Sequence, residues 1–291
     1  MTAPPNLHAY SGLNINAVKR LLIKQFREAG LGSPDLDARV LIMAATGFTP
    51  TDIIARGTEY PSADIINLIS DYAVRRIAGE PVDYILGYRE FYGRRFRISK
   101  DVLSPRPETE MLVDAALGLS KNKPKAHILD LGTGSGAIII SILAELEEVE
   151  GVAVDISETA LEIAQENAVV HDVDGRLTCL QGSWFTPVSS RFDIIVSNPP
   201  YITARAMKEL DVEVKDYDPD LALCGGEDGL TAYRDILAKA VNYLSPNGIL
   251  LFEIGYDQGL LVNALLDDAG FTDISVHKDL SGHDRMIKAA L

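Results

Sequence analysis

The sequence has 291 residues, of which 47% are hydrophobic and 24% are charged, a composition typical of one large globular domain with a small one. Residues 1–96 carry 11 basic and 10 acidic side chains, whereas residues 97–291 carry 16 basic and 32 acidic ones. So acidic a body repels a phosphate backbone, and nonspecific DNA or RNA binding is therefore disfavoured.

Helical periodicity dominates the chain before about residue 84. In residues 14–30 the apolar side chains recur at spacings of three and four, which predicts an amphipathic helix that ends at Gly30. Residues 35–47, 49–57 and 62–79 have the same pattern. We therefore expect residues 1–84 to form a small bundle of about four or five helices.

The period changes in the segment YREFYGRRFRISKDVL, residues 88–103. Aromatic residues alternate there around Gly93, and this alternation predicts a β-hairpin. Residues 85–104 are accordingly expected to form a hairpin linker between the helical domain and the rest of the chain.

From Pro105 onward, strand and helix signals alternate regularly. The first helix is expected over residues 105–119, opened by Pro107 and with acidic residues in its first turn. Repeated strand–helix units predict a parallel sheet covered on both faces, and a short glycine-containing connection predicts that the last two strands pair antiparallel. The expected strands are 127–131, 152–155, 177–180, 192–197, 249–254, 272–277 and 285–289, and the later helices are 136–147, 157–171, 229–244 and 258–269.

Ligands of open α/β sheets bind beyond the carboxyl ends of the strands, so the residues at those ends are the candidate site. After the first strand, Asp130 precedes Gly132, Thr133, Gly134, Ser135 and Gly136, which lead into an apolar helix. Glycines let the backbone turn sharply and approach a ligand, and the helix N-terminus adds free N–H groups.

The next three strands end in an acid, an aromatic residue and a proline-rich turn. The Asp155 carboxylate can accept hydrogen bonds from both hydroxyls of a ribose. Trp184, the sole tryptophan, can stack on a flat base. The fourth strand runs into Asn198-Pro199-Pro200-Tyr201, and the two prolines end the strand because they cannot donate ladder hydrogen bonds.

Each feature alone also has a structural interpretation. Glycines after a strand often form only a turn, Asp155 can precede a helix cap, Trp184 can belong to the core, and paired prolines often punctuate loops. Their joint order on four successive strand ends indicates a nucleoside site. The spacing is G-x-G-x-G rather than the G-x-G-x-x-G of dinucleotide sites. An acidic, glycine-lined, aromatic pocket suits the cationic, phosphate-free S-adenosyl-L-methionine better.

At these residues the sequence resembles the HemK/PrmC family of methyltransferases, which modify the glutamine of the Gly-Gly-Gln loop in peptide chain release factors and so support translation termination. The resemblance rests on PRPETE, DLGTGSGAI, AVDIS, Asn167-Ala168, GSWF, FDIIVSNPPYI, GGEDGL, EIGYDQ and DLSGHDRMI. It implies an α/β, Rossmann-like, seven-stranded methyltransferase sheet over residues 105–291, with an antiparallel last strand, and an N-terminal helical domain that receives the release factor.

The resemblance also implies residue roles. Gly132, Thr133, Gly134, Ser135 and Gly136 would hold the methionine part of S-adenosylmethionine, Asp155 the ribose and Trp184 the adenine, with Asn198 also next to the cofactor; S-adenosyl-L-homocysteine would be the product. Asn198, Pro199, Pro200 and Tyr201 would bind the glutamine side chain, with Asn198, Pro199 and Tyr201 acting in catalysis. Arg106 and Glu108 receive no role.

An alternative is a nucleic-acid methyltransferase acting on exocyclic amines of the adenine N6 type, because the Asn-Pro-Pro-Tyr turn is shared with such enzymes. Another is a cofactor-binding module that has lost catalysis. The acidic body counts against the first and the intact turn against the second.

The remaining expectations concern location and assembly. No apolar run approaches about 18 residues, so no membrane span is expected, and residues 1–14 lack the pattern of a secretory signal. Cys179 and Cys224 match no metal-ligand spacing, nor do the five histidines, so we expect no metal and a reducing cytoplasm. The expected protein is a monomer with class 1 release factors as partners and no direct nucleic-acid contact.

Overall fold

The computed structural model describes residues 9–121 and 123–291. Residues 1–8, part of the segment in which no secretory signal is expected, lie outside the described residues. The chain divides into two compact units, Met1–Gly87 and Tyr88–Leu291. The division falls just before the hairpin, so the hairpin belongs to the second unit.

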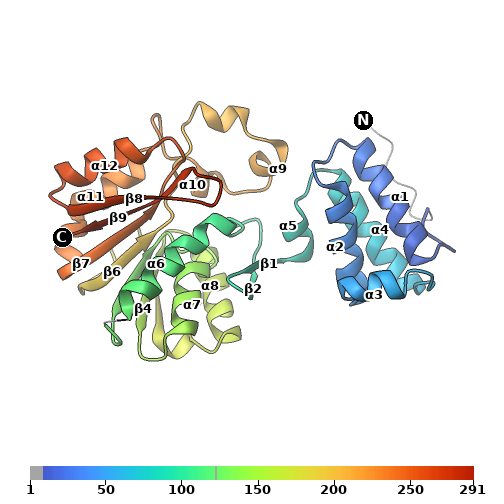
Figure 1. Cartoon of the computed structure of the whole chain (residues 1–291), viewed down its shortest axis with the longest axis horizontal. Helices are drawn as coiled ribbons and strands as arrows, with labels where there is room; N and C mark the ends of the chain where they lie inside the picture. The colour runs from blue at the N-terminus through green and yellow to red at the C-terminus, as the bar shows by residue number, and fades with distance from the viewer. Residues whose placement is uncertain (1–8, 122) are drawn as a thin grey trace. The chain divides into compact units, whose positions relative to one another are not determined.

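The first unit is a helical bundle with its own apolar core (Figure 1). In α1 the apolar positions Ile15, Val18, Leu22 and Phe26 are all buried, as their spacing predicts. Asn14 caps α1 by accepting a hydrogen bond from the Ala17 N–H. The helices are α1 (Ile15–Glu28), α2 (Pro34–Thr46), α3 (Pro50–Ala55), α4 (Ala63–Ile77) and α5 (Val82–Leu86).

The second unit contains a seven-stranded sheet in the order β5-β4-β3-β6-β7-β9-β8. Only β9 runs against its neighbours, β7 and β8, which confirms the predicted antiparallel last strand. The strands are β3 (His127–Leu131), β4 (Glu150–Asp155), β5 (Leu177–Gln181), β6 (Phe192–Ser197), β7 (Leu244–Glu253), β8 (Thr272–Lys278) and β9 (Asp284–Ala290).

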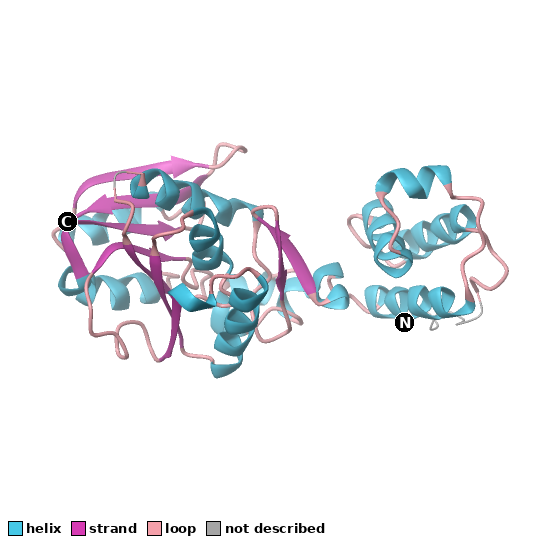
Figure 2. Cartoon of the chain, turned by 90° about the horizontal axis from the view of Figure 1, so that it is seen from below, coloured by secondary structure: helices cyan, strands magenta, loops and turns pink. Residues whose placement is uncertain are grey.

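Helices cover both faces of this sheet (Figure 2). Successive residues of a strand point to opposite faces, so Ile194 and Val196 of β6 join one apolar cluster and Ile195 joins the other. The first cluster includes α6 (Glu110–Ser120), α7 (Ala137–Glu145) and α8 (Glu158–Val170), and the second includes α11 (Thr231–Tyr243) and α12 (Gly259–Asp268).

Several segments differ from the sequence prediction. Strand β7 begins at Leu244 rather than at residue 249, because it follows α11 directly. Between β6 and α11 lie three short helices that the sequence pattern did not indicate, η3 (Ala206–Glu209), α9 (Val212–Lys215) and α10 (Asp220–Leu223). The predicted first helix starts as a short 3-10 turn, η1 (Pro107–Thr109), before α6. A further 3-10 turn, η2 (Asp174–Arg176), precedes β5.

One buried side chain ties the hairpin to the loop after β3. The hairpin consists of β1 (Tyr88–Phe91) and β2 (Arg94–Arg97). Asn167 of α8 accepts a hydrogen bond from the Arg97 N–H at 2.7 Å and donates to the Arg97 carbonyl at 3.0 Å and to the Ser135 carbonyl at 2.9 Å. Its amide therefore fixes the distance between the hairpin and the glycine-rich loop.

Replacing Asn167 with alanine should destabilise the second unit by about 3 kcal/mol. The substitution leaves the Arg97 N–H, the Arg97 carbonyl and the buried Ser135 carbonyl without these hydrogen-bond partners. Urea unfolding followed by the fluorescence of Trp184, which lies in this unit, measures the change. The exposed Asn242→Ala on α11 makes the same chemical change and should cost less than about 0.5 kcal/mol. Equal losses in the two variants would contradict the bridging role of Asn167.

Candidate functional site

The site lies where the strand order reverses, between β3 and β6. These strands are parallel, and Leu131 pairs with Ser197 at their carboxyl ends. The Ser197 hydroxyl donates a hydrogen bond to the Leu131 carbonyl at 2.6 Å and ties the two ends together. Gly132 and Asn198 are the first residues after these two strands. The chain therefore leaves the sheet side by side at these residues, at the position where open α/β sheets bind ligands.

The glycine-rich loop of residues 132–136 is held by the end of β4. Gly132, Gly134 and Gly136 all have positive φ, which a side chain would disfavour. The Gly134 N–H donates to Asp155 Oδ2 at 2.9 Å, and the Ser157 N–H donates to Asp155 Oδ1 at 2.9 Å. A carboxylate has about four acceptor positions. Asp155 can thus shape the loop and still accept hydrogen bonds from a ligand.

A buried carboxylate, Asp130, and a half-buried one, Asp155, lie next to this loop. Burial raises the pKa of Asp155 above its usual range, against the opposing effect of the backbone N–H groups. Burial also raises the pKa of Asp130 to about 7, although the Thr133 hydroxyl donates to its Oδ2 at 2.7 Å. The Asp130 Oδ1 atom has no hydrogen-bond partner among the residues that the structure describes.

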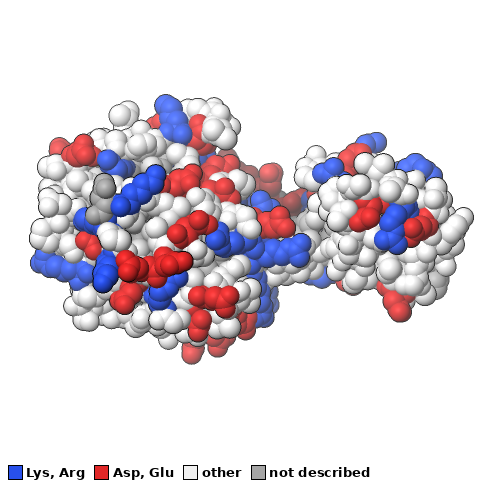
Figure 3. Space-filling view, turned by 60° about the horizontal axis from the view of Figure 1, so that its bottom comes forward, with Lys and Arg blue, Asp and Glu red and all other residues white. Residues whose placement is uncertain are grey.

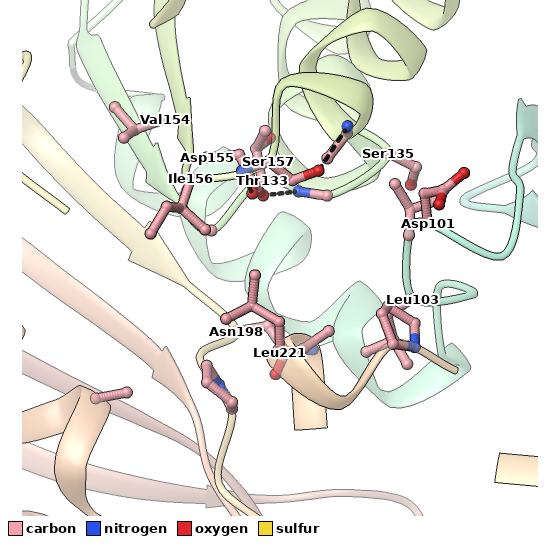
Figure 4. Close-up of a pocket in the computed structure, with 18 of the residues that line it drawn as sticks. Asp101, Leu103, Thr133, Ser135, Val154, Asp155, Ile156, Ser157, Asn198 and Leu221 are labelled. Atoms are coloured by element: carbon pink, nitrogen blue, oxygen red, sulfur yellow. Dashed lines mark hydrogen bonds between the residues drawn. The ribbon is translucent and has the colours of Figure 1, made fainter. Parts of the chain in front are cut away.

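A cavity of about 650 Å³ opens over these strand ends, a size typical of small-molecule sites. In Figure 4, Thr133, Asp155 and Ser157 lie along one side of the pocket, and Asn198 and Leu221 lie across from them. The structure brings eight of the predicted site residues to its lining: Gly132, Thr133, Gly134, Ser135, Asp155, Trp184, Asn198 and Pro200. Gly136, Pro199 and Tyr201 are not among the lining residues.

These three residues lie just behind the lining. Gly136 is the N-cap residue just before α7, and a Cβ atom there would come within 2.6 Å of Ile140 Cδ1. Pro199 is buried. Tyr201 is half-buried and packs against the core on the α11 and α12 side, where burial raises the pKa of its hydroxyl to about 12.

The Asn198 side chain is held by a neighbour from another segment. Its Nδ2 donates to the Thr109 hydroxyl oxygen at 3.3 Å, and the Thr109 hydroxyl donates to Glu253 Oε2 at 2.5 Å. Thr109 ends η1 and also lines the pocket, whereas Glu253 is the last residue of β7. Three segments far apart in the sequence therefore meet at one amide.

The backbone of the Asn-Pro-Pro-Tyr corner, residues 198–201, is braced from below. Gln258 Nε2 donates to the Tyr201 carbonyl at 3.1 Å and to the Gly229 carbonyl at 3.2 Å. A Cβ atom on Gly229 would come within 2.4 Å of the Tyr201 oxygen, so only glycine permits this approach. The GGEDGL and EIGYDQ segments thus support the corner without lining the cavity at Gly229 or Gln258.

Comparison with known proteins identifies the family. The PrmC N-terminal domain model matches residues 19–87, and the Methyltransferase small domain model matches residues 108–214. The release factor glutamine methyltransferase of Agrobacterium fabrum is 44% identical over 268 residues, 91% of this chain and 93% of that protein. That of Caulobacter vibrioides is 41% identical over 264 residues, 90% and 91% of the two chains. The chain belongs to the release factor glutamine methyltransferase family. The resemblance seen in the sequence motifs is confirmed.

A solved structure shares the methyltransferase fold. The hMettl16 catalytic domain in complex with MAT2A 3′UTR hairpin 6 is 14% identical and aligns with a TM-score of 0.57, over 68% of this chain and 76% of that one. At this identity the likeness shows the fold alone.

Several pocket residues of this methyltransferase were missed by the sequence analysis. Leu103, Thr109, Ile156 and Leu221 all line the cavity. Ile156 is 53% exposed although apolar, and its position directly after Asp155 at a strand end was the available signal. Thr109 belongs to PRPETE, one of the motifs on which the resemblance rests, but it was not among the predicted site residues. Leu221 lies in a helix that the sequence did not predict.

The described residues show two further properties of the methyltransferase. They contain no group of three or more His, Cys, Asp or Glu side chains placed to hold a metal ion. Among the helices in the described ranges, none combines the length and the apolar composition needed to cross a bilayer.

Gly229→Ala should destabilise the second unit of the methyltransferase by about 3 kcal/mol or more, from the left-handed φ and the contact with the Tyr201 carbonyl together. Gly270→Ala is the matched control, because Gly270 has φ of +86° but open space where a Cβ would lie. It should cost about 1–2 kcal/mol. Urea unfolding of both variants measures the difference, and a Gly229→Ala variant no less stable than Gly270→Ala would rule out the brace.

Proposed function

We propose that the protein transfers a methyl group from S-adenosyl-L-methionine to the side-chain amide nitrogen (N5) of the glutamine in the Gly-Gly-Gln loop of class 1 release factors. The observation that carries this proposal is the pairing of Leu131 with Ser197, because it sets a glycine-rich loop and an amide-bearing corner on one pocket. Membership of the release factor glutamine methyltransferase family supports the substrate class.

The residues present fit the cofactor. Gly134 has φ of +55° and open space where a Cβ would lie, so its backbone can approach a ligand closely. Residues 132–136 would hold the methionine part, and the free acceptor positions of Asp155 would bind the ribose hydroxyls. Trp184 and Ile156 would contact the adenine. When bound, S-adenosylmethionine supplies an electrophilic methyl group, whose transfer forms an N–C bond, breaks an S–C bond, and leaves neutral S-adenosylhomocysteine and one proton.

The Asn198 corner would orient the acceptor amide. An amide nitrogen is a weak nucleophile because its lone pair is delocalised into the carbonyl. The Asn198 Oδ1 atom and the Pro199 carbonyl would accept hydrogen bonds from the two N–H groups of the substrate amide. These bonds would fix the nitrogen in place and stabilise the positive charge that develops on it. The Tyr201 ring would pack against the flat amide. Asn198 is neutral, so its contribution is orientation and electrostatics rather than removal of a proton.

Methylation of nucleic-acid amines is the less well supported alternative. The same corner suits an adenine amino group. However, residues 97–291 carry 32 acidic and 16 basic side chains. Figure 3 shows acidic and basic side chains interspersed over the second unit on the face in view. Such a surface is poorly suited to binding a phosphate backbone.

Two substitutions separate the acceptor side from the cofactor side. Asn198→Ala should lower kcat by about 10²- to 10³-fold with cofactor affinity nearly unchanged, because it removes one oriented acceptor. Asp155→Ala should weaken cofactor binding by about tenfold or more, because charge-assisted hydrogen bonds to the ribose are lost. Single-turnover methylation of intact release factor and calorimetry with S-adenosylmethionine provide the two measurements. Normal turnover by Asn198→Ala would refute the proposal.

The first unit would recruit the release factor. Its apolar core shares no residue with the two clusters of the second unit, so residues 88–291 should fold without it. We expect this fragment to bind S-adenosylmethionine with nearly unchanged affinity but to lose about tenfold or more in kcat/KM toward intact release factor, because one binding contact is gone. Equal kcat/KM for the fragment and the full chain would remove the recruitment role.

A further inference from the structure

The Asn198 amide, Thr109 and Glu253 form a hydrogen-bonded chain with a defined direction. Glu253 is 2% exposed and Thr109 is 4% exposed, so water does not compete freely for these groups. The Thr109 hydroxyl donates to Glu253 Oε2 at 2.5 Å, and Asn198 Nδ2 donates to the same hydroxyl oxygen at 3.3 Å. Glu253 and Thr109 are 144 residues apart in the sequence.

The direction follows from the number of hydrogens available. An ionised carboxylate only accepts, and a hydroxyl has a single hydrogen to donate. Because Thr109 gives that hydrogen to Glu253, its oxygen can serve Asn198 only as an acceptor. The NH₂ end of the Asn198 amide must then face Thr109, and the carbonyl end, Oδ1, must face the other way.

We propose that Glu253, acting through Thr109, is a positioning residue that holds the Asn198 carbonyl oxygen toward the acceptor and so makes the corner selective for NH₂ groups. This inference rests on the proposed function and deepens it. With the amide reversed, Asn198 would present two N–H groups to the N–H groups of a glutamine side chain, and donors would face donors. The carboxylate thus determines which chemical class of acceptor the corner binds.

The surroundings of Glu253 indicate that its charge can be removed at moderate pH. Burial raises the pKa of Glu253 to about 7, opposed by the Thr109 hydroxyl and by Arg285 and assisted by Glu108. The Tyr201 hydroxyl also lowers this pKa, and the Tyr233 hydroxyl donates to the Glu253 backbone carbonyl at 2.9 Å. A protonated Glu253 can donate to Thr109, whose own hydrogen can then turn to the Asn198 oxygen.

The first test removes or retains the hydroxyl. Thr109→Val should lower kcat for methylation of intact release factor about 30- to 100-fold, because a misplaced group in the site costs up to about 10². The dissociation constant for S-adenosylmethionine should stay within about threefold of wild type, since the loss is one of orientation. Thr109→Ser keeps the hydroxyl and should restore most of kcat. Ser120→Ala is the control. It also removes a buried hydroxyl, but this hydroxyl donates to the Ala116 carbonyl within α6, so kcat should stay unchanged.

The second test uses pH. In the wild type, kcat should fall as the pH drops through about 7, because the pKa of Glu253 is raised and its active form is the deprotonated one. Glu253→Gln should have a low kcat without this fall. Burial also raises the pKa of Asp130, next to the glycine-rich loop, to about 7. A fall in kcat caused by Asp130 would persist in Glu253→Gln and would be accompanied by weaker binding of the cofactor.

The third test does not depend on methyl transfer. In the full chain labelled with ¹⁵N-asparagine, the side-chain NH₂ signal that disappears in Asn198→Ala should shift with pH through about 7 and lose that shift in Glu253→Gln. If the Asn198 signal responds to pH and to Glu253→Gln as expected but the wild type does not methylate release factor, the proposed function is refuted while the hydrogen-bonded chain stands. An Asn198 signal insensitive to both pH and Glu253→Gln, or equal kcat for Thr109→Val and Ser120→Ala, would overturn the inference.

Discussion

The parallel register of β3 and β6 is the constraint on which the site depends. Leu131 pairs with Ser197, and each strand then ends because of the residues that follow it. After β3 the glycines turn the chain with positive φ, and after β6 two prolines offer no N–H to continue the ladder. Since the strands are hydrogen-bonded neighbours, a loop that suits a nucleoside and a corner that suits an amide are brought together without any further device.

The rigidity of the corner comes from residues that do not line the cavity. Gln258 holds the Tyr201 and Gly229 carbonyls, and Gly229 lets the chain pass within a distance that a methyl group would block. Such support is needed because prolines restrict φ but do not fix the position of a turn relative to the sheet. Positioning catalysis tolerates little displacement, so a corner that acts by orientation needs a braced backbone.

The sequence predicted the sheet and the strand-end residues well, because both depend on local signals. Apolar runs end at glycine, acid or proline. Strands β3, β4 and β6 end at the predicted residues, and β5 ends one residue later. Contacts between distant segments were not predictable in this way. Nothing near Thr109 indicates that it meets Glu253, and nothing near Tyr201 indicates that its ring also packs against the core. The short helices between β6 and α11 have too few residues to show a period.

The same arrangement occurs on both sides of the pocket. Thr133 donates to the buried carboxylate of Asp130 next to the glycine-rich loop, and Thr109 donates to the buried carboxylate of Glu253 near the Asn-Pro-Pro-Tyr corner. A carboxylate in an apolar strand end is costly unless donors satisfy it, and both retain raised pKa values. In return, each one fixes the direction of a hydroxyl. A reaction between a cationic methyl donor and a neutral amide requires negative potential and oriented acceptors, and a threonine bound to a buried carboxylate provides both.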